Sequence, residues 1–209
     1  MRLFLLSSRS LRPQQARIDF TIRSAAIPLG PTREWLRLQP LNPSIIPTFL
    51  DFEASSLDLV CSYPIEVGIC LPDGSLHSWL IRPAPLWNDW SESAEAIHGI
   101  PRQQLLDEGL EVELVAQALN DHLEGMVFSD AWTFDSLWLY QLYKAARMKP
   151  SFRLESISLL LSDQQVEAWQ AHRKLVLERF GLRSHRAGND ARILHETWKS
   201  LQHPHAASA

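Results

Sequence analysis

The pattern of hydrophobic and polar positions predicts an α/β domain that begins near residue 46. Runs rich in β-branched and aromatic residues occupy 45–53, 63–71 and 76–81, and turn-forming residues at 72–74 separate the last two. Such runs, joined by short polar connections, are typical of consecutive antiparallel strands. We therefore expect a three-stranded antiparallel meander at the start of a sheet.

The pattern then changes to the helical period. A helix start is expected at 91–95, and apolar residues recur at helical spacing from Val112 to Leu123. Later helical segments and short apolar strands alternate along the chain. The strands lie at 126–129 and 152–157, and the helices include 137–143, 164–180 and 189–202. Together these elements predict a mixed five-stranded sheet flanked by helices.

Charge is distributed unevenly along the 209 residues. The formal net charge is −4, but residues 1–45 carry seven arginines and two acidic residues, a net +5, which leaves −9 for the rest. We expect 1–45 to be a basic, proline-containing extension that is poorly ordered in part, 46–202 to be the folded domain, and 203–209 to be a disordered tail. An acidic domain is not a general nucleic-acid-binding surface on charge alone.

The cysteines and the hydropathy indicate in which cellular compartment the protein is expected. Cys61 and Cys70 form no CxxC or zinc-spaced arrangement, which argues against a disulfide framework and a structural zinc site. No apolar run approaches the roughly 18–20 residues of a membrane span. We expect a cytoplasmic protein with no membrane partner. The arginine-rich, acid-poor residues 1–25 also fit an organellar targeting segment, and that alternative stays open.

Four acidic residues lie where a predicted strand ends or a predicted helix begins. Asp51 and Glu53 are two positions apart on the first strand, so their side chains share one face. Asp135 and Asp190 each open a helix. If the first strand is central and these helices pack beside its end, the four carboxylates meet. Carboxylates so close repel one another, and their hard oxygen atoms favour Mg²⁺ or Mn²⁺ between them.

Three segments resemble, in order and spacing, the motifs of the DnaQ-like 3′→5′ exonucleases of the DEDDh branch, in the RNase H-like superfamily. They are Asp51-Phe52-Glu53, the run from Asp130 to Asp135, and the run from His185 to Ala191. Residues 63–68 and 97–100 also resemble the family's second strand and its Ile-His-Gly-Ile segment. Each motif alone is weak evidence, but all of them in order are strong. The resemblance spans 46–202 and implies an RNase H-like sheet.

The resemblance implies a metal-dependent 3′→5′ exonuclease that hydrolyses phosphodiester bonds by a two-metal mechanism. Asp51, Glu53, Asp135 and Asp190 would bind two Mg²⁺ or Mn²⁺ ions, and His185 would be the general base. An unperturbed pKa near 6.5 suits histidine to take a proton from water around neutral pH. The expected partner is a nucleic acid with a single-stranded or frayed 3′ end. Homodimers are common among such relatives and are also considered.

Four further positions near the motifs are candidates for contact with the substrate: Ala54, Leu57, Trp132 and Phe134. Leu57 corresponds to the apolar residue that wedges against the terminal base in the family, or else it packs within its own loop. Trp132 lies inside the second motif, where its ring either stacks on a base or covers the start of the helix. Stacking tolerates any sequence because every base has a π-face.

Asp130 departs from the family, which usually has asparagine at this position. The residue either adds a negative charge to the site or caps the following helix. The departure leaves an alternative function open, a catalytically weak or inactive module that binds nucleic-acid ends or a protein partner. A glycosidase that uses a carboxylate pair and needs no metal is a more remote alternative.

Three other polar residues receive an interpretation from their context. Glu66, on an apolar strand, is either a supporting partner of the metal ligands or an edge charge. His98 precedes a glycine after a helical turn and is interpreted as structural. His195 has no motif around it and is predicted to lie on the surface.

Overall fold

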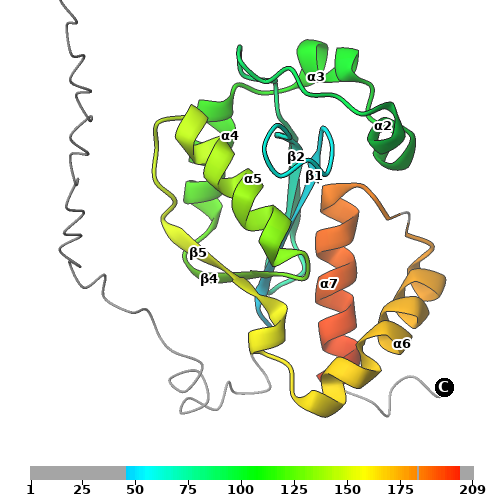
Figure 1. Ribbon diagram of the computed structural model, residues 1–209. Coiled ribbons are helices and arrows are strands. Elements are labelled where there is room, and N and C mark those ends of the chain that lie inside the picture. The colour runs from blue at the N-terminus through cyan, green and yellow to red at the C-terminus, as the bar shows by residue number, and fades with distance from the viewer. Residues whose placement is uncertain (1–45, 183, 203–209) are drawn as a thin grey trace, which may run out of the picture.

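The computed structural model describes residues 46–182 and 184–202, so the predicted extension 1–45 and tail 203–209 lie outside the described residues. Within these ranges five strands form one sheet in the order β3-β2-β1-β4-β5. Their bounds are β1 Thr48–Ala54, β2 Pro64–Cys70, β3 Leu76–Leu80, β4 Gly125–Ser129 and β5 Phe152–Ser156. β1 pairs antiparallel with β2 and parallel with β4. The meander and the mixed sheet are confirmed, and β1 lies at the centre (Figure 1).

The helices are α2 Glu92–His98, α3 Arg102–Glu108, α4 Val112–His122, α5 Trp132–Ala145, α6 Asp163–Phe180 and α7 Ala187–Gln202, with a 3₁₀ turn η1 at Ile157–Leu159. The segments predicted from helical spacing are confirmed in α4 to α7. The hydrophobic pattern does not predict α3, because Leu105 is the only buried residue in its seven positions and leaves no apolar period. No helix in the described part of the chain is long and apolar enough to cross a membrane.

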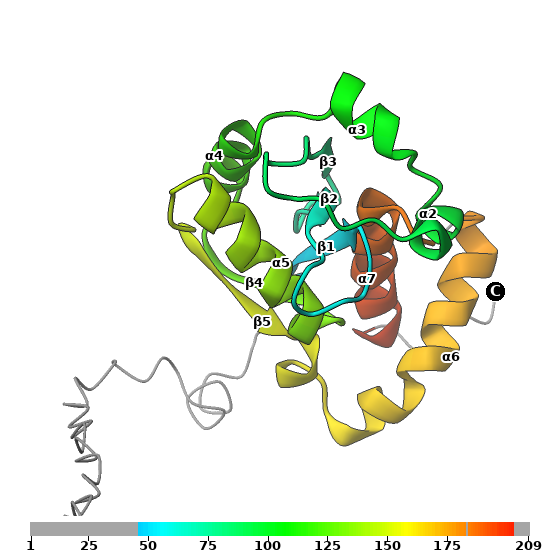
Figure 2. The same ribbon diagram turned by 45° about the horizontal axis from the view of Figure 1, so that its top comes forward.

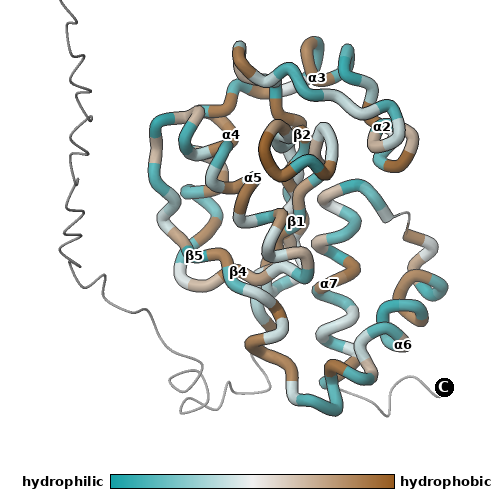
Figure 3. The backbone as a smooth tube through the Cα atoms, in the orientation of Figure 1, coloured by the Kyte–Doolittle hydropathy of each residue, from teal (hydrophilic) through white to brown (hydrophobic). Residues whose placement is uncertain are grey.

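The alternation of β1 divides its residues between two faces of the sheet. Leu50, Phe52 and Ala54 are buried in a core that α4 and α5 share with the sheet. Phe49 belongs to a second core with residues of α6 and α7. Asp51 and Glu53 lie on the same face as Phe49 because side chains alternate along a strand. Figure 3 shows hydrophobic residues along the strands and mainly hydrophilic residues on the outer turns of α6.

α7 crosses the sheet and lies between the sheet and α6, as the turned view shows (Figure 2). Its inner side is buried along most of its length. His195 lies on this side, almost fully buried, with its ring 6.3 Å from that of Phe49. The prediction that His195 is a surface residue is therefore wrong. α7 carries polar residues on its buried side. A prediction from hydropathy alone places such residues at the surface.

The first turn of α7 is fixed on β2 by two residues of that strand. A Cβ atom at Gly68 would lie 2.2 Å from the carbonyl carbon of Ala187 and 2.3 Å from the amide nitrogen of Gly188, so only glycine permits this approach. Glu66, almost fully buried, accepts a hydrogen bond from the Ala187 amide at 3.0 Å. It also accepts two from the guanidinium of Arg186, at 2.8 and 3.0 Å. A carboxylate at a helix N-terminus is favourable because it satisfies free amides and opposes the helix dipole.

We predict that Gly68→Ala lowers the free energy of unfolding by about 1–3 kcal/mol, since the added methyl group must displace backbone atoms. Gly188→Ala is the matched control. Its added Cβ would meet only the Ser78 side chain, at 3.3 Å, and alanine is the better helix former. Urea unfolding of both variants measures the difference. Equal stability of the two would contradict the close contact at Gly68.

Candidate active site

Three of the predicted carboxylates meet where β1 faces the first turn of α7. One carboxylate oxygen from each of Asp51, Glu53 and Asp190 lies within 4.8 Å of the other two. The two-residue spacing on β1 places the first pair on one face, and the docking of α7 on Gly68 brings Asp190 to it. The convergence expected from the sequence therefore occurs for these three residues.

Asp135 lies in the first turn of α5 and is completely buried. Neither of its carboxylate oxygens has a hydrogen-bond partner within the described residues. Burial raises the pKa of Asp135 to about 8, although the nearby Ser129 hydroxyl and Phe52 amide act in the opposite direction. The charge of Asp135 in turn raises the pKa of Asp51, so it is an electrostatic neighbour of the three-carboxylate group.

The other carboxylates are also difficult to ionise. Burial, followed by the negative charges of Asp190 and Glu66, raises the pKa of Glu53 to about 8, against the opposing effect of Arg186. Burial and then the neighbouring charge of Asp135 hold the pKa of Asp51 well above its ordinary value. Without a compensating cation, the site is therefore most stable with some of its carboxyl groups protonated.

The donor set fits a hard divalent cation. Every converging side chain offers carboxylate oxygens, which Mg²⁺ and Mn²⁺ prefer over the nitrogen and sulfur donors of typical zinc sites. A buried carboxylate such as Asp135, with both oxygens unpaired, is costly unless a cation or donor meets it. A possible acidic metal-binding group is therefore present in this structure.

His185 lies on the connection from α6 to α7 and is exposed. Its backbone has a φ of 68°, a left-handed conformation that non-glycine residues rarely adopt. The His185 amide donates a hydrogen bond to Oδ2 of Asp190, and the Arg186 amide donates to the same oxygen at 3.3 Å. The carboxylate of Asp190 therefore holds the backbone that carries His185, five residues earlier in the chain.

Arg173 lies near the site, although no motif in the sequence points to it. It lies on α6, and its Nη2 is 3.4 Å from Oδ1 of Asp190. Loss of water around the carboxylate raises the pKa of Asp130, and the charge of Arg173 opposes this rise. The extra acidic residue of the second motif thus has a positive charge nearby. The sequence shows an acidic residue, Asp130, where the family usually has asparagine. It does not indicate which basic residue lies near that charge.

The predicted substrate contacts differ in accessibility. Leu57 is 72% exposed on the loop after β1, and Trp132 is 42% exposed at the start of α5. The indole N–H of Trp132 donates to the Leu154 carbonyl at 2.9 Å, which fixes the ring. Phe134 is half-buried, 5.6 Å from the ring of Trp138, and Ala54 is buried in the core. Leu57 and Trp132 are thus the two of these candidates that present apolar surface to solvent.

Hydrogen bonds hold the loop that presents Leu57. The hydroxyls of Ser55 and Ser56 both donate to Oδ2 of Asp89, at 2.9 and 2.6 Å. Oδ1 of Asp58 accepts from two amides further along the same loop. An exposed leucine on a loop held in this way is pre-positioned for contact, because little conformational entropy remains to be lost.

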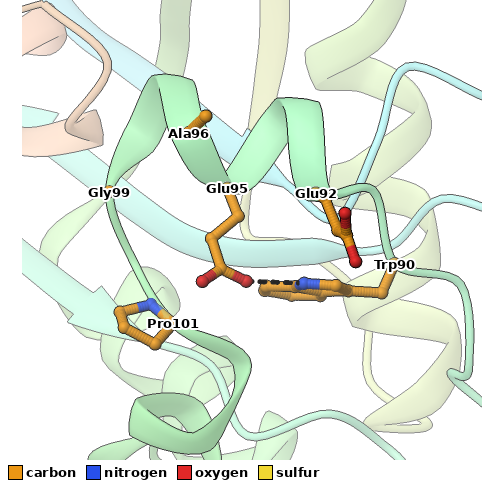
Figure 4. A pocket seen from close by; sticks show the side chains of 6 residues that line it. All are labelled: Trp90, Glu92, Glu95, Ala96, Gly99 and Pro101. Carbon is orange, nitrogen blue, oxygen red and sulfur yellow. Dashed lines mark hydrogen bonds between the residues drawn. The ribbon is translucent and has the colours of Figure 1, made fainter.

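A separate shallow pocket lies beside α2, lined by Trp90, Glu92, Glu95, Ala96, Gly99 and Pro101. Figure 4 shows the indole N–H of Trp90 donating to Glu95, at 2.8 Å. His98 packs edge-on against Trp90, and its Nδ1 accepts a hydrogen bond from the Ile100 amide at 3.0 Å. These contacts agree with the structural interpretation of His98. The acidic lining is unfavourable for phosphate groups.

Comparison of the fold with solved structures gives matches to exonuclease I. The Escherichia coli enzyme in complex with a dA16 oligonucleotide matches with a TM-score of 0.55 and 16% identity, over 77% of this chain and 42% of that one. The enzyme from Methylocaldum szegediense matches with a TM-score of 0.55 and 14% identity, over 77% and 41%. A zinc-bound E. coli complex with single-stranded DNA gives 0.53 and 14%, over 76% and 41%.

These matches define the class of fold, the RNase H-like α/β fold of exonuclease I. The chain spans about two-fifths of the length of these structures. No family model and no curated protein matches the sequence.

We predict that, without metal, the protein becomes less stable as the pH rises from about 5 to 8. Folded Glu53 and Asp135 keep their protons until about pH 8, whereas unfolded carboxyl groups lose them near pH 4. The folded state therefore binds more protons in this window, and deprotonation favours unfolding. Tm measured against pH in EDTA tests this, and Asp51→Asn should flatten the decline.

Mn²⁺ should reverse this decline, because a cation stabilises the charged carboxylates. At about 100 times its Kd, the ion should raise Tm by roughly 5–11 °C, with a larger effect at pH 8 than at pH 6. Asp121→Asn, on the exposed side of α4, is the matched control and should retain the effect. A Tm that does not change on addition of Mn²⁺ at either pH value would contradict a cation site.

Proposed function

We propose that this protein is a metal-dependent 3′→5′ exonuclease of the DnaQ-like, DEDDh type, with residues 46–202 as its catalytic domain. The observation that carries the proposal is the meeting of the Asp51, Glu53 and Asp190 carboxylates beside the buried, unpaired Asp135. The similarity of the fold to exonuclease I supports the same activity.

In this proposal Asp51, Glu53, Asp135 and Asp190 hold two Mg²⁺ or Mn²⁺ ions. Ions held there would supply a lower pKa for the attacking water and positive charge beside the phosphate and the leaving 3′ oxygen. The proposed ligands come from three rigid elements, β1, α5 and α7. The position of the ions would therefore be fixed by the packing of these elements. The raised pKa values of Glu53 and Asp135 fit groups that ionise fully only against a cation.

His185 is the proposed general base. It is exposed on the loop before α7, and its amide is bonded to the carboxylate of Asp190. A histidine held next to a metal ligand can accept a proton from water attacking the phosphate and release it to solvent. The loop is anchored by its backbone amides and by the Arg186 guanidinium on Glu66, while the exposed ring of His185 can turn over the site.

The proposed substrate is a nucleic acid with a single-stranded or frayed 3′ end. Two apolar side chains, Leu57 and Trp132, are exposed on elements that adjoin the carboxylates. Aromatic rings stack on bases without regard to sequence, which suits an enzyme that degrades any terminus. The exonuclease I structures in complex with dA16 and dT13 make single-stranded DNA the first substrate to test.

The test is digestion of a 5′-labelled single-stranded oligonucleotide with Mg²⁺ or Mn²⁺. We expect products shortened from the 3′ end, and EDTA should stop the reaction. Asp51→Asn should reduce the rate by at least about 100-fold, since even the supporting partners of metal ligands cost 10–100-fold. Asp121→Asn is the control that removes an acidic group far from the cluster. RNA and duplex substrates tested in parallel identify the preferred nucleic acid.

Two results would contradict the proposal. Cleavage that persists in EDTA and in Asp51→Asn would come from another activity. Tight binding of the oligonucleotide with no shortening after long incubation in Mn²⁺ would favour the alternative, an inactive exonuclease-fold module that binds nucleic-acid ends.

A further inference from the structure

Arg173 brings a positive charge from a different element to the carboxylate cluster. α6 packs along α7, on the side away from the sheet (Figure 2). The guanidinium of Arg173 reaches Asp190 with Nη2, 3.4 Å from Oδ1, and the side chain is 23% exposed. The group therefore lies at the edge of the cluster, partly open to solvent.

The hydrogen bonds of this guanidinium are incomplete. Nη1 is buried and has no hydrogen-bond partner among the described residues. Arg186 shows what a complete pair looks like in the same region, since its Nε and Nη2 bind both oxygens of Glu66 at 3.0 and 2.8 Å. Leaving a buried charged donor unpaired is costly. A hydrogen-bond acceptor on a ligand would therefore satisfy Nη1 of Arg173.

The position of Arg173 would be unfavourable if the cluster bound only cations. Arg173 binds Asp190, which belongs to the three-carboxylate group, and a positive charge there competes with a cation for the same carboxylate. The arrangement is favourable if an anion enters together with the cation. A planar guanidinium with one nitrogen on a carboxylate and another unpaired suits a phosphate oxygen.

We propose that Arg173 binds a phosphate oxygen of the nucleic-acid substrate at the edge of the carboxylate cluster. This inference rests on the proposed exonuclease function and adds α6 to the substrate-binding elements. The competing role for Arg173 is charge compensation of Asp130, and the experiment separates the two.

The test measures binding of a fluorescent single-stranded oligonucleotide by anisotropy, in Ca²⁺ and in EDTA, over a range of salt concentrations. Arg173→Gln should weaken binding about tenfold or more, as loss of a charged hydrogen bond does. It should also reduce the slope of log K against log salt by about 0.7, the value for one phosphate contact on a single strand. A residue with a purely structural role would leave that slope unchanged.

Two variants serve as controls. Lys174→Gln removes the same charge from the next position of α6, where the side chain is 78% exposed, and should keep both affinity and slope. Arg173→Lys retains the charge without the planar fork, so it should keep the slope and lose part of the affinity. It also provides the measurement if the glutamine variant fails to fold.

Asp130→Asn combined with Arg173→Gln separates phosphate binding from charge compensation. If Arg173 only balances Asp130, the double variant regains wild-type binding. If it binds phosphate, the double variant stays as weak as Arg173→Gln. Recovery in the double variant, or an unchanged salt slope in Arg173→Gln, overturns the proposal.

The outcomes also separate this proposal from the proposed function. Cleavage by the wild type with unaltered binding and cleavage in Arg173→Gln would refute the role of Arg173 alone. A wild type that binds without cleaving would refute the exonuclease, while the binding measurements still decide on Arg173. A wild type that neither binds nor cleaves would refute both.

Discussion

The contact between the first turn of α7 and β2 determines where the site can form. Gly68 lets the helix backbone come within van der Waals reach of the strand, and Glu66 accepts a hydrogen bond from the first amide of the helix. Asp190 follows within that turn, and His185 lies two residues before the start of the helix. Because one buried carboxylate and one missing methyl group set this position, the acidic cluster depends on residues that carry no chemistry of their own.

The cluster places several carboxylates where they repel one another and have lost water. Such an arrangement is unfavourable in the folded state, and it persists because the opposite face of β1 is anchored in a large apolar core with α4 and α5. The amides before α7 and the charge of Arg173 offset part of the cost of burying the Asp190 carboxylate. The free energy gained by the apolar core on one face of the sheet therefore offsets the cost of the buried carboxylates on the other.

Local pattern was sufficient to predict the strands, the longer helices and the spacing of Asp51 and Glu53, because each leaves a period of two or of 3.6 in the sequence. It was insufficient for contacts between distant segments. Glu66 and Arg186 are 120 positions apart, and the approach of α7 to Gly68 has no local signature. Arg173 lies on a largely polar helix beside Lys174, with Arg179 further along the same helix, so its charge gives no indication that it faces the site.

The two-sided strand β1 has a consequence for folding. A shift of its pairing by one residue would exchange its faces, so that Asp51 and Glu53 would enter the apolar core while Leu50 and Phe52 would face α7. Burying two carboxylates among aliphatic side chains costs far more than an ordinary mispairing. The acidic pair therefore penalises the wrong register during folding, and the same two side chains that would hold cations in the finished protein help to select the sheet that holds them.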